Sequence, residues 1–289
     1  MTVGVVVPAA GSGTRLGEAV PKAFVDLGGG TTILEHCVDG ILRAGVADTV
    51  VVVVPVHLID EATRLVPAAT VVAGGSHRSE SVRAGIAGTD SDIVLVHDAA
   101  RPFTPPDVFH RVVDAVRHGH LAVVPGLPVA DTLKEVDPAS AGHDTGEAVI
   151  RTVDRERLRA IQTPQGFTRA ALMQAHADAS GLATDDAGLA ERAGIPVHVV
   201  AGDPLAMKIT TPWDLRIARD VVAETSPAGR VATPAGRVVD KHSTPAGRVV
   251  DEHSTPAGRV VDERSTPAGR VVDERSEETY RDHRTEPPS

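Results

Sequence analysis

Short valine-rich runs recur along the chain and restrict its fold more than any other feature of the sequence. Most are apolar on consecutive residues, a pattern typical of strands buried on both faces of a parallel sheet. They occupy residues 3–7, 49–54, 70–73, 93–96, 121–125 and 195–200. Segments with helical periodicity separate them. The chain is therefore predicted to be an α/β protein of three layers, with a mostly parallel twisted sheet between helices.

The first of these runs ends in a loop of small residues. Gly11 and Gly13 lack a Cβ, so the backbone can approach a ligand with its N–H groups directed at anionic oxygens. Arg15 and Lys22 bring two cations to the same place. The dinucleotide fingerprint G-x-G-x-x-G fails because position 16 is leucine, and no G-x-x-x-x-G-K-[ST] loop is present. Two alternatives remain, a plain glycine-rich turn or a phosphate-binding loop made of Pro8, Ala9, Ala10, Gly11 and Gly13.

Two further predicted strands also end in candidate ligand-binding segments. The run at 70–73 leads into a second glycine loop that opens a helix, and helix N-terminal amides suit an anion or a base carbonyl. The run at 93–96 leads to the turn containing Asp98 and Arg101, at the sheet edge where open α/β folds bind ligands. The structural alternatives are a capped strand-to-helix turn and an ion pair between Asp98 and Arg101. The candidate residues are Gly75, Ser76, Arg78, Ser81, Asp98, Ala99 and Arg101.

Local signals place several helices. Thr32 followed by Glu35 forms a capping box, Gly45 ends the helix, and its apolar face is predicted to comprise Leu34, Val38, Ile41 and Leu42. A second helix is predicted over 106–118, and Thr211 caps the last one. Residues 162–167 are interpreted as a loop leading into a helix, and Lys208, by itself, as a surface lysine.

Residues 128–155 are predicted to form a protruding β-hairpin arm. Two alternating stretches flank a polar turn that extends from Asp137 to Gly146. An arm that buries little surface on its own domain usually packs on a partner, so a homodimer is expected.

The overall composition excludes several classes of protein. The chain has a formal net charge of −10, and residues 1–224 hold 19 Lys and Arg against 28 Asp and Glu, so nucleic-acid binding is not expected. Cys37 is the single cysteine, which excludes an intrachain disulfide and favours a reducing cytoplasm. No positively charged segment followed by a longer apolar region opens the chain, and no apolar run approaches 18 residues, so neither a secretory signal nor a membrane span is expected.

The last part of the chain, residues 225–289, differs from the predicted domain at 1–224. The pentapeptide Pro-Ala-Gly-Arg-Val begins at positions 227, 234, 245, 256 and 267. A proline and a glycine in every unit forbid a continuous helix, and the balanced charge predicts a disordered tail with an unknown partner.

Eight motifs in order make residues 3 to about 222 resemble the 2-C-methyl-D-erythritol 4-phosphate cytidylyltransferases. They are Pro8 to Arg15, Pro21-Lys22, Gly74-Gly75 with Arg78 and Ser81-Val82, Val96 to Pro102, Asp131-Thr132, Thr152 to Arg155, Thr163-Pro164-Gln165 and Lys208-Ile209-Thr210. The resemblance implies a Rossmann-like nucleotidyltransferase fold and transfer of the cytidylyl group of CTP to the substrate phosphate, with release of pyrophosphate.

The same resemblance implies a role for each candidate residue. Arg15 and Lys22 would stabilise the pentacoordinate α-phosphorus, with Mg²⁺ bridging the triphosphate, and the second loop would lie near the cytidine. Arg155 and Lys208 would clamp the methylerythritol phosphate, assisted by Thr132 and by the turn that contains Asp98. Thr132 and Arg155 would reach the site from the partner subunit. Ser76 departs from the family, some of whose members carry an acidic residue there.

Two other functions are compatible with these motifs. A ribitol-phosphate or other polyol-phosphate cytidylyltransferase would share the fold, the first loop and the Asp98 turn. A non-catalytic nucleotide-binding regulator would share the fold, but it would not need Arg15 and Lys22 directed at a transition state.

Overall fold

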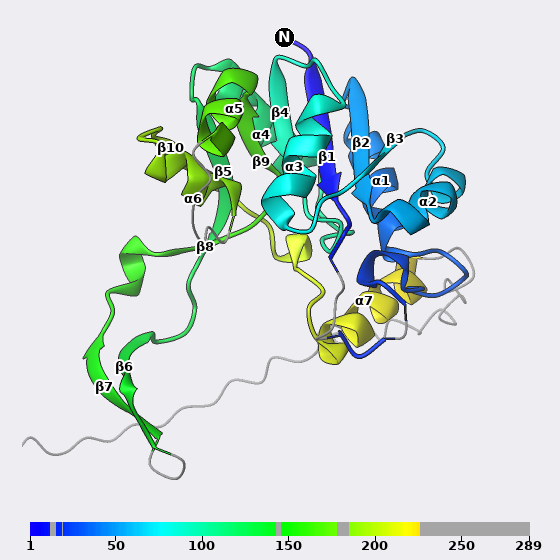
Figure 1. Ribbon diagram of the computed structural model, residues 1–289. Helices are drawn as coiled ribbons and strands as arrows, with labels where there is room; N and C mark the ends of the chain where they lie inside the picture. The colour runs from blue at the N-terminus through cyan, green and yellow to red at the C-terminus, as the bar shows by residue number, and fades with distance from the viewer. Residues whose placement is uncertain (12–15, 19, 143–145, 178–184, 226–289) are drawn as a thin grey trace, which may run out of the picture. The chain divides into compact units, whose positions relative to one another are not determined.

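The computed structural model describes residues 1–11, 16–18, 20–142, 146–177 and 185–225, and side chains are placed in all of these except 139–142. An eight-stranded sheet and a separate two-stranded sheet account for the strands (Figure 1). The strands are β1 (Val3–Pro8), β2 (Thr49–Val54), β3 (Thr70–Ala73), β4 (Ile93–Val96), β5 (Ala122–Pro128), β6 (Lys134–Gly142), β7 (Gly146–Thr152), β8 (Arg159–Ile161), β9 (Gln165–Thr168) and β10 (Val197–Ala201). The predicted tail lies outside the described residues.

The eight-stranded sheet confirms the predicted α/β class. Its strand order is β10-β5-β9-β4-β1-β2-β3, with β8 paired to β5. The pairs among β1, β2, β3 and β4 are parallel, as is the pair of β10 with β5. The carboxyl ends of β1, β3 and β4 therefore meet at one edge, as the sequence required.

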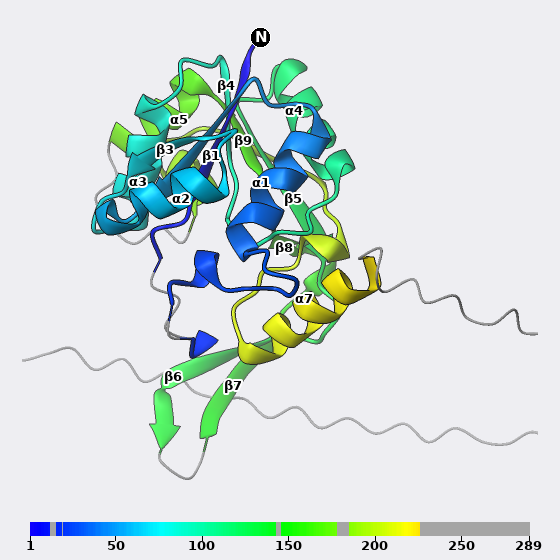
Figure 2. The same ribbon diagram turned by 90° about the vertical axis from the view of Figure 1, so that its right-hand side faces the viewer.

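Helices cover both faces of this sheet (Figure 2). Alternate valines of β1 supply the two interfaces: Val5 packs with α1, α2 and α4, whereas Val6 packs with α3, α5 and α6. Gly85 lets α3 approach closely, because a Cβ there would collide with Val6. The helices are α1 (Ile33–Ala44), α2 (Ile59–Leu65), α3 (Arg78–Ala87), α4 (Pro106–Arg117), α5 (Arg169–Ala177), α6 (Asp186–Arg192) and α7 (Pro212–Thr225).

The predicted capping box of α1 is confirmed. The Glu35 amide donates to Thr32 Oγ1 at 3.2 Å, and Glu35 Oε2 accepts from the Thr32 amide at 2.7 Å. Gly45 ends the helix with φ of 67°, in the left-handed region. The predicted apolar face is wrong at Leu42, which is 44% exposed, because Cys37 and Ala44 complete the buried stripe instead.

The prediction of a loop over 162–167 that leads into a helix holds for residues 162–164 and for the helix, but it is wrong for residues 165–167. Gln165–Thr168 form β9, which lies antiparallel between β4 and β5 in the middle of the sheet. Gln165 and Gly166 have low strand propensity, so the local sequence carries no strand signal. Packing in the folded protein explains the glycine, because a Cβ on Gly166 would collide with Val112 of α4.

The predicted hairpin arm is present as the two-stranded sheet. Within the described residues, β6 and β7 pair with each other and with no strand of the larger sheet (Figure 2). The predicted polar turn is too long, because β6 continues from Asp137 to Gly142 through a register shift. Val149 and Ile150 of β7 are 57% and 59% exposed. None of the helices in the described part of the chain has the length and hydropathy to cross a bilayer.

Candidate active site

A cavity of about 520 Å³ opens at the carboxyl ends of β1, β3 and β4. Three loops and two lysines line it, so the segments that the sequence singled out separately share one site. Its described lining is Pro8, Ala9, Ala10, Gly11, Lys22, Ala23, Gly75, Ser76, His77, Arg78, Ser81, Asp98, Ala99, Ala100 and Lys208. The candidates Gly13 and Arg15 lie outside the described residues.

A second cavity of about 370 Å³ adjoins the first. The two share Arg78, Asp98 and Lys208 in their linings. The second is completed by Arg101, Ile161, Gln162, Thr163, Gln165 and Asp185. Two polar cavities that meet at cationic side chains can hold two anionic substrates side by side, which is the arrangement a phosphoryl or nucleotidyl transfer needs.

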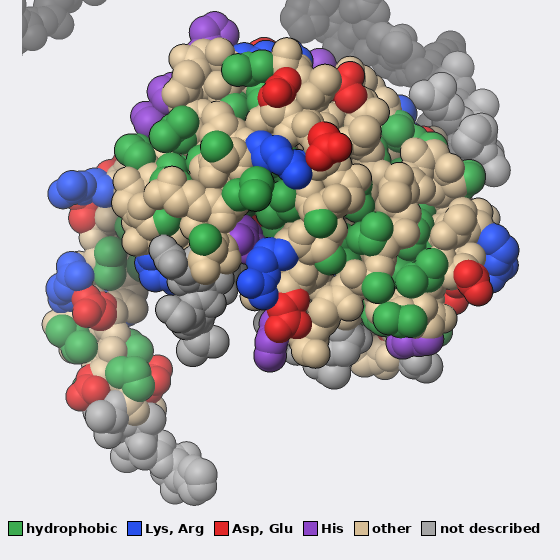
Figure 3. All heavy atoms as spheres, turned by 45° about the horizontal axis from the view of Figure 1, so that its top comes forward, with side chains coloured by type: hydrophobic (Ala, Val, Ile, Leu, Met, Phe, Trp, Pro, Cys, Tyr) green, Lys and Arg blue, Asp and Glu red, His purple; other side chains and the backbone are tan. Residues whose placement is uncertain are grey.

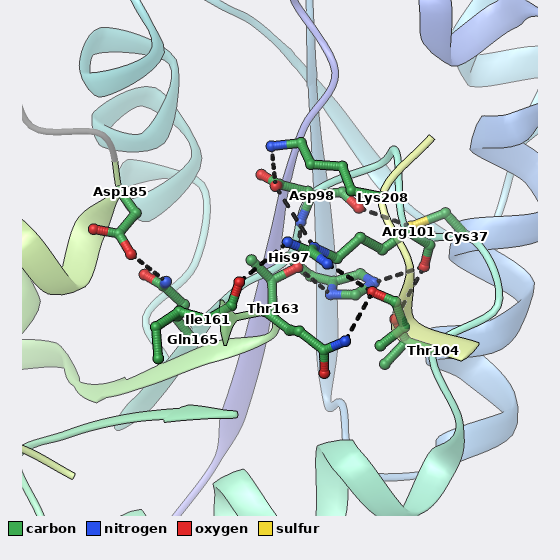
Figure 4. Close-up of polar contacts among 12 residues, drawn as sticks. Cys37, His97, Asp98, Arg101, Thr104, Ile161, Thr163, Gln165, Asp185 and Lys208 are labelled. Carbon is green, nitrogen blue, oxygen red and sulfur yellow. Dashed lines mark hydrogen bonds and ion pairs between the residues drawn. The ribbon is translucent and has the colours of Figure 1, made fainter. Parts of the chain in front are cut away.

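Asp98 is the centre of the charged cluster between the cavities (Figure 4). Its carboxylate lies 2.7 Å from Lys208 Nζ, 3.7 Å from Arg78 Nη2 and 3.9 Å from Arg101 Nε. Burial opposes ionisation, but the charges of Lys208 and Arg78 outweigh it and lower the pKa of Asp98 to about 2. Lys208 is 43% exposed, as expected of a surface lysine, but its ion pair with Asp98 also makes it part of the charged cluster.

Arg101 is held mainly by backbone carbonyls. Its Nη1 donates to the Ala206 oxygen at 2.6 Å, and its Nη2 donates to the Ile161 oxygen at 3.4 Å (Figure 4). The ion pair to Asp98 that the sequence left open is present but long, at 3.9 Å. Arg101 thus fixes the strands around the second cavity while it adds positive charge to the cavity's lining.

Two backbone amides of the second glycine loop already donate hydrogen bonds to a side chain of the same chain. Glu80 Oε2 accepts from the Ser76 amide at 2.8 Å and from the His77 amide at 3.4 Å. The sequence-based expectation that these N–H groups await an anion therefore does not hold for this arrangement. This segment instead contributes Arg78 and the serines Ser76 and Ser81 to the lining of the larger cavity.

His97 lies buried beneath the Asp98 turn. Its Nδ1 is 3.0 Å from Thr163 Oγ1 and its Nε2 is 3.3 Å from the Arg101 oxygen. Burial lowers the pKa of His97 to about 4, although Asp98 acts in the opposite sense. The imidazole is therefore neutral at pH 7 and braces the turn that carries Asp98.

This buried histidine makes stability depend on pH. A folded-state pKa below the ordinary 6.5 means full stabilisation above pH 6.5 and a loss as pH falls toward 4, since only the unfolded chain takes up the proton. We expect the free energy of unfolding to fall by about 2 kcal/mol between pH 7 and pH 5. Burial also lowers the pKa of half-buried His36, which adds to the pH dependence in the same direction.

Urea unfolding at pH 7 and pH 5 measures the change in unfolding free energy. His97→Gln should remove most of this fall in unfolding free energy, whereas His57→Gln, at an exposed histidine, should not. An unchanged pH dependence in His97→Gln would show that another group causes the fall.

Thr132 and Arg155 are not brought to the cavities of their own chain. Both side chains are exposed, and neither lines either cavity. Arg155 donates to the Ala130 oxygen at the base of the hairpin.

Sequence reasoning missed part of the second cavity. Gln162 and Asp185 line it, yet the sequence motifs include neither of them. Gln165 also lines it and was part of the Thr163-Pro164-Gln165 motif, which was the only signal available.

The described face drawn in Figure 3 carries acidic and basic side chains interspersed. The cationic cluster of the site comes from the cavity linings, which contain Lys22, Arg78, Arg101 and Lys208. A small-residue loop and a cationic cluster between two adjoining cavities, on a mostly parallel sheet, define an α/β nucleotidyltransferase.

Comparison with known proteins narrows this class. Residues 3–224 match the family described as 2-C-methyl-D-erythritol 4-phosphate cytidylyltransferase, and the chain belongs to that family. The enzyme of this name from Rhodococcus jostii is 56% identical over 221 residues, which cover 76% of this chain and 94% of that protein. The one from Nocardia farcinica is 54% identical and covers 75% and 92%. The crystal structure of the enzyme from Thermus thermophilus has a TM-score of 0.61 at 36% identity and covers 76% and 98%.

The family fixes the reaction. The cytidylyl group of CTP is transferred to 2-C-methyl-D-erythritol 4-phosphate, which gives 4-diphosphocytidyl-2-C-methyl-D-erythritol and pyrophosphate for isoprenoid biosynthesis. The regulator without catalytic activity is thereby excluded, and the resemblance that the sequence motifs indicated is confirmed.

Proposed function

We propose that the larger cavity binds CTP and the second cavity binds the methylerythritol phosphate, so that the reacting phosphates meet at Asp98 and Lys208. The observation that carries this proposal is that the two cavities share these residues and Arg78. In this arrangement the first loop, from Pro8 to Gly13, holds the triphosphate. The second loop, with Gly75, Ser76, Arg78 and Ser81, and the turn with Asp98 and Ala99 lie near the cytidine.

The transfer step needs positioning and charge neutralisation more than proton transfer. An oxygen of the substrate phosphate, already ionised at neutral pH, attacks the α-phosphorus of CTP and forms the new P–O bond. The bond from the α-phosphorus to the bridging oxygen breaks, and pyrophosphate leaves with that electron pair. Lys22 and Arg15 stabilise the charge that builds on the pentacoordinate phosphorus. Lys208, Arg101 and Arg155 hold the attacking phosphate.

Mg²⁺ is the metal we propose for this step. In the described part of the chain, no three acidic, histidine or cysteine side chains cluster as metal ligands. Mg²⁺ suits such a site, because it is commonly held by substrate phosphates and one or two carboxylates and keeps several waters. Asp98 is the one acidic side chain in the described lining of the larger cavity. Bound to the triphosphate, the ion would neutralise phosphate charge.

A homodimer through the arm would complete the site. The hairpin exposes Val149 and Ile150, and its base carries Thr132 and Arg155, which line no cavity of their own chain. Insertion of the arm against a second copy would bury the apolar side chains and bring both polar residues to the partner's second cavity.

The single cysteine, buried and free, supports a reducing, cytoplasmic location.

The substrate assignment is tested by pyrophosphate release from CTP and Mg²⁺. We expect release with 2-C-methyl-D-erythritol 4-phosphate and at most slow release with ribitol 5-phosphate, at matched concentrations. Glucose 1-phosphate serves as the control for nonspecific acceptors. Faster release with ribitol 5-phosphate would contradict the assignment of the second cavity and favour the polyol-phosphate alternative.

A further inference from the structure

A buried carboxylate outside the reacting groups connects the core to the nucleotide cavity. Asp186, the first residue of α6, is fully buried, and its Oδ2 lies 2.7 Å from Arg78 Nη2. Its other oxygen, Oδ1, lies 2.9 Å from Nε2 of His176, which is 3% exposed and belongs to α5. Asp186 lines neither cavity itself, whereas Arg78 lines both.

Two aspartates form ion pairs with Arg78, and the electrostatic influence of Asp185 adds to theirs. Asp98 lies 3.7 Å away and already has a closer partner, Lys208, at 2.7 Å. Asp186 lies 2.7 Å from Arg78, the shorter of the two aspartate contacts that this arginine makes. A buried carboxylate without a cationic partner is strongly unfavourable, so Asp186 and Arg78 hold each other in place.

The backbone around Asp186 is itself fixed. Gln165 Nε2 of β9 donates to Asp185 Oδ2 at 2.7 Å, and the Ala187 amide donates to Gln165 Oε1 at 3.0 Å. Asp185 caps the helix by accepting from the Gly188 amide at 2.9 Å. The first turn of α6 is thus tied to the central strand β9, and the Asp186 carboxylate has a defined position from which to orient a guanidinium.

We propose that Asp186, oriented by His176, is a positioning residue that fixes the Arg78 guanidinium at the junction of the two cavities. Arg78 is 36% exposed at its side chain and would otherwise be drawn to Asp98, where it would compete with Lys208. The buried pair keeps both cations in separate places before substrates bind. This inference rests on the proposed role of Arg78 in the nucleotide cavity.

A double-mutant cycle tests the coupling. Asp186→Asn removes the charge with little change in volume, and we expect it to raise the apparent KM for CTP about tenfold with a smaller effect on kcat, because Arg78 is misplaced. Arg78→Ala should raise the same KM at least as much. In the Arg78→Ala background, Asp186→Asn should change KM by less than about twofold, because its route to the substrate is gone.

Controls separate positioning from stability. Asp186→Glu retains the charge, so its KM for CTP should be closer to the wild-type value than that of Asp186→Asn. Asp114→Asn breaks an exposed aspartate–arginine pair on α4, with its atoms 3.8 Å apart, and should leave KM unchanged. Thermal unfolding of each variant reports the stability cost, which should be smaller for Asp186→Asn in the Arg78→Ala background, where the buried carboxylate has already lost its cation. If Asp186→Asn does not fold, His176→Asn replaces it in the same cycle, since it loosens the carboxylate without removing its charge.

The outcomes are distinguishable. An unchanged KM in Arg78→Ala would overturn the proposed role of Arg78 in nucleotide binding, and the inference with it. A raised KM in Arg78→Ala, combined with an Asp186→Asn effect that is absent or equally large in both backgrounds, would overturn the positioning role alone. If Asp186→Asn raises the KM for CTP when Arg78 is present and not when Arg78 is replaced by alanine, the positioning role of Asp186 is established.

Discussion

Lys22→Ala is expected to lower kcat by about 100-fold to 1,000-fold while changing the Kd of CTP by less than about threefold. The lysine lines the larger cavity beside the first loop, at the start of the 3-10 turn Lys22–Phe24. Buried Ala23 and Phe24 anchor that turn, so the ammonium is presented from a fixed backbone. Charge on the α-phosphorus grows only in the transition state, and a cation placed to meet it contributes mainly to turnover.

Single-turnover kinetics and CTP binding measured separately test this expectation. Arg64→Ala on α2 is the matched control, because it removes an exposed cation that lines neither described cavity. Parallel losses in kcat and in CTP affinity would show that Lys22 contacts the nucleotide in the ground state as well as in the transition state. A loss of affinity with unchanged kcat would contradict the catalytic assignment outright.

Mixing two inactive variants is expected to restore activity. Lys22→Ala disables the cavity of its own chain, and Arg155→Ala disables the arm that the partner would receive. In a mixed dimer, one site combines the intact Lys22 of one chain with the intact Arg155 of the other. Random pairing of equal amounts therefore gives about one quarter of the wild-type activity.

The measurement is pyrophosphate release at subsaturating methylerythritol phosphate, before and after subunit exchange or co-expression. By itself, Arg155→Ala should chiefly raise the KM for the sugar phosphate, because its guanidinium holds the attacking phosphate. Mixing Lys22→Ala with Lys22→Ala/Arg155→Ala is the control, since no combination of these chains gives a complete site. No recovery with the first pair would place Arg155 in the site of its own chain, or outside any site.

Much of the fold could be predicted because it depends on short-range chemistry. The consecutive apolar residues of β1, β2 and β4 identify strands buried on both faces, and Thr32 with Glu35 marks a helix start by hydrogen bonds within one turn. The small residues after β1 identify a backbone that a ligand can approach. These signals lie within a few residues of one another, so no knowledge of the tertiary structure is needed to interpret them.

The parts that could not be predicted depend on residues distant in the sequence. Gly166 lies in a strand because β4 and β5 pair with it on both sides, and glycine is required there because Leu95 and Val112 leave no room for a larger side chain. Lys208 resembles a surface lysine until β4 places Asp98 beside it, and nothing local to Asp186 indicates that Arg78 and His176 lie against it.

The sequence by itself thus determined the α/β class, the two glycine loops and the arm, because periodicity and capping are local properties of the chain. Only the tertiary structure decided which charges meet, since an ion pair forms where folding removes water from between two groups that the chain keeps far apart. Asp98 shows the difference. Its place at the end of a strand follows from the sequence, whereas its low pKa follows from Lys208, which lies before α7, and from Arg78, the first residue of α3.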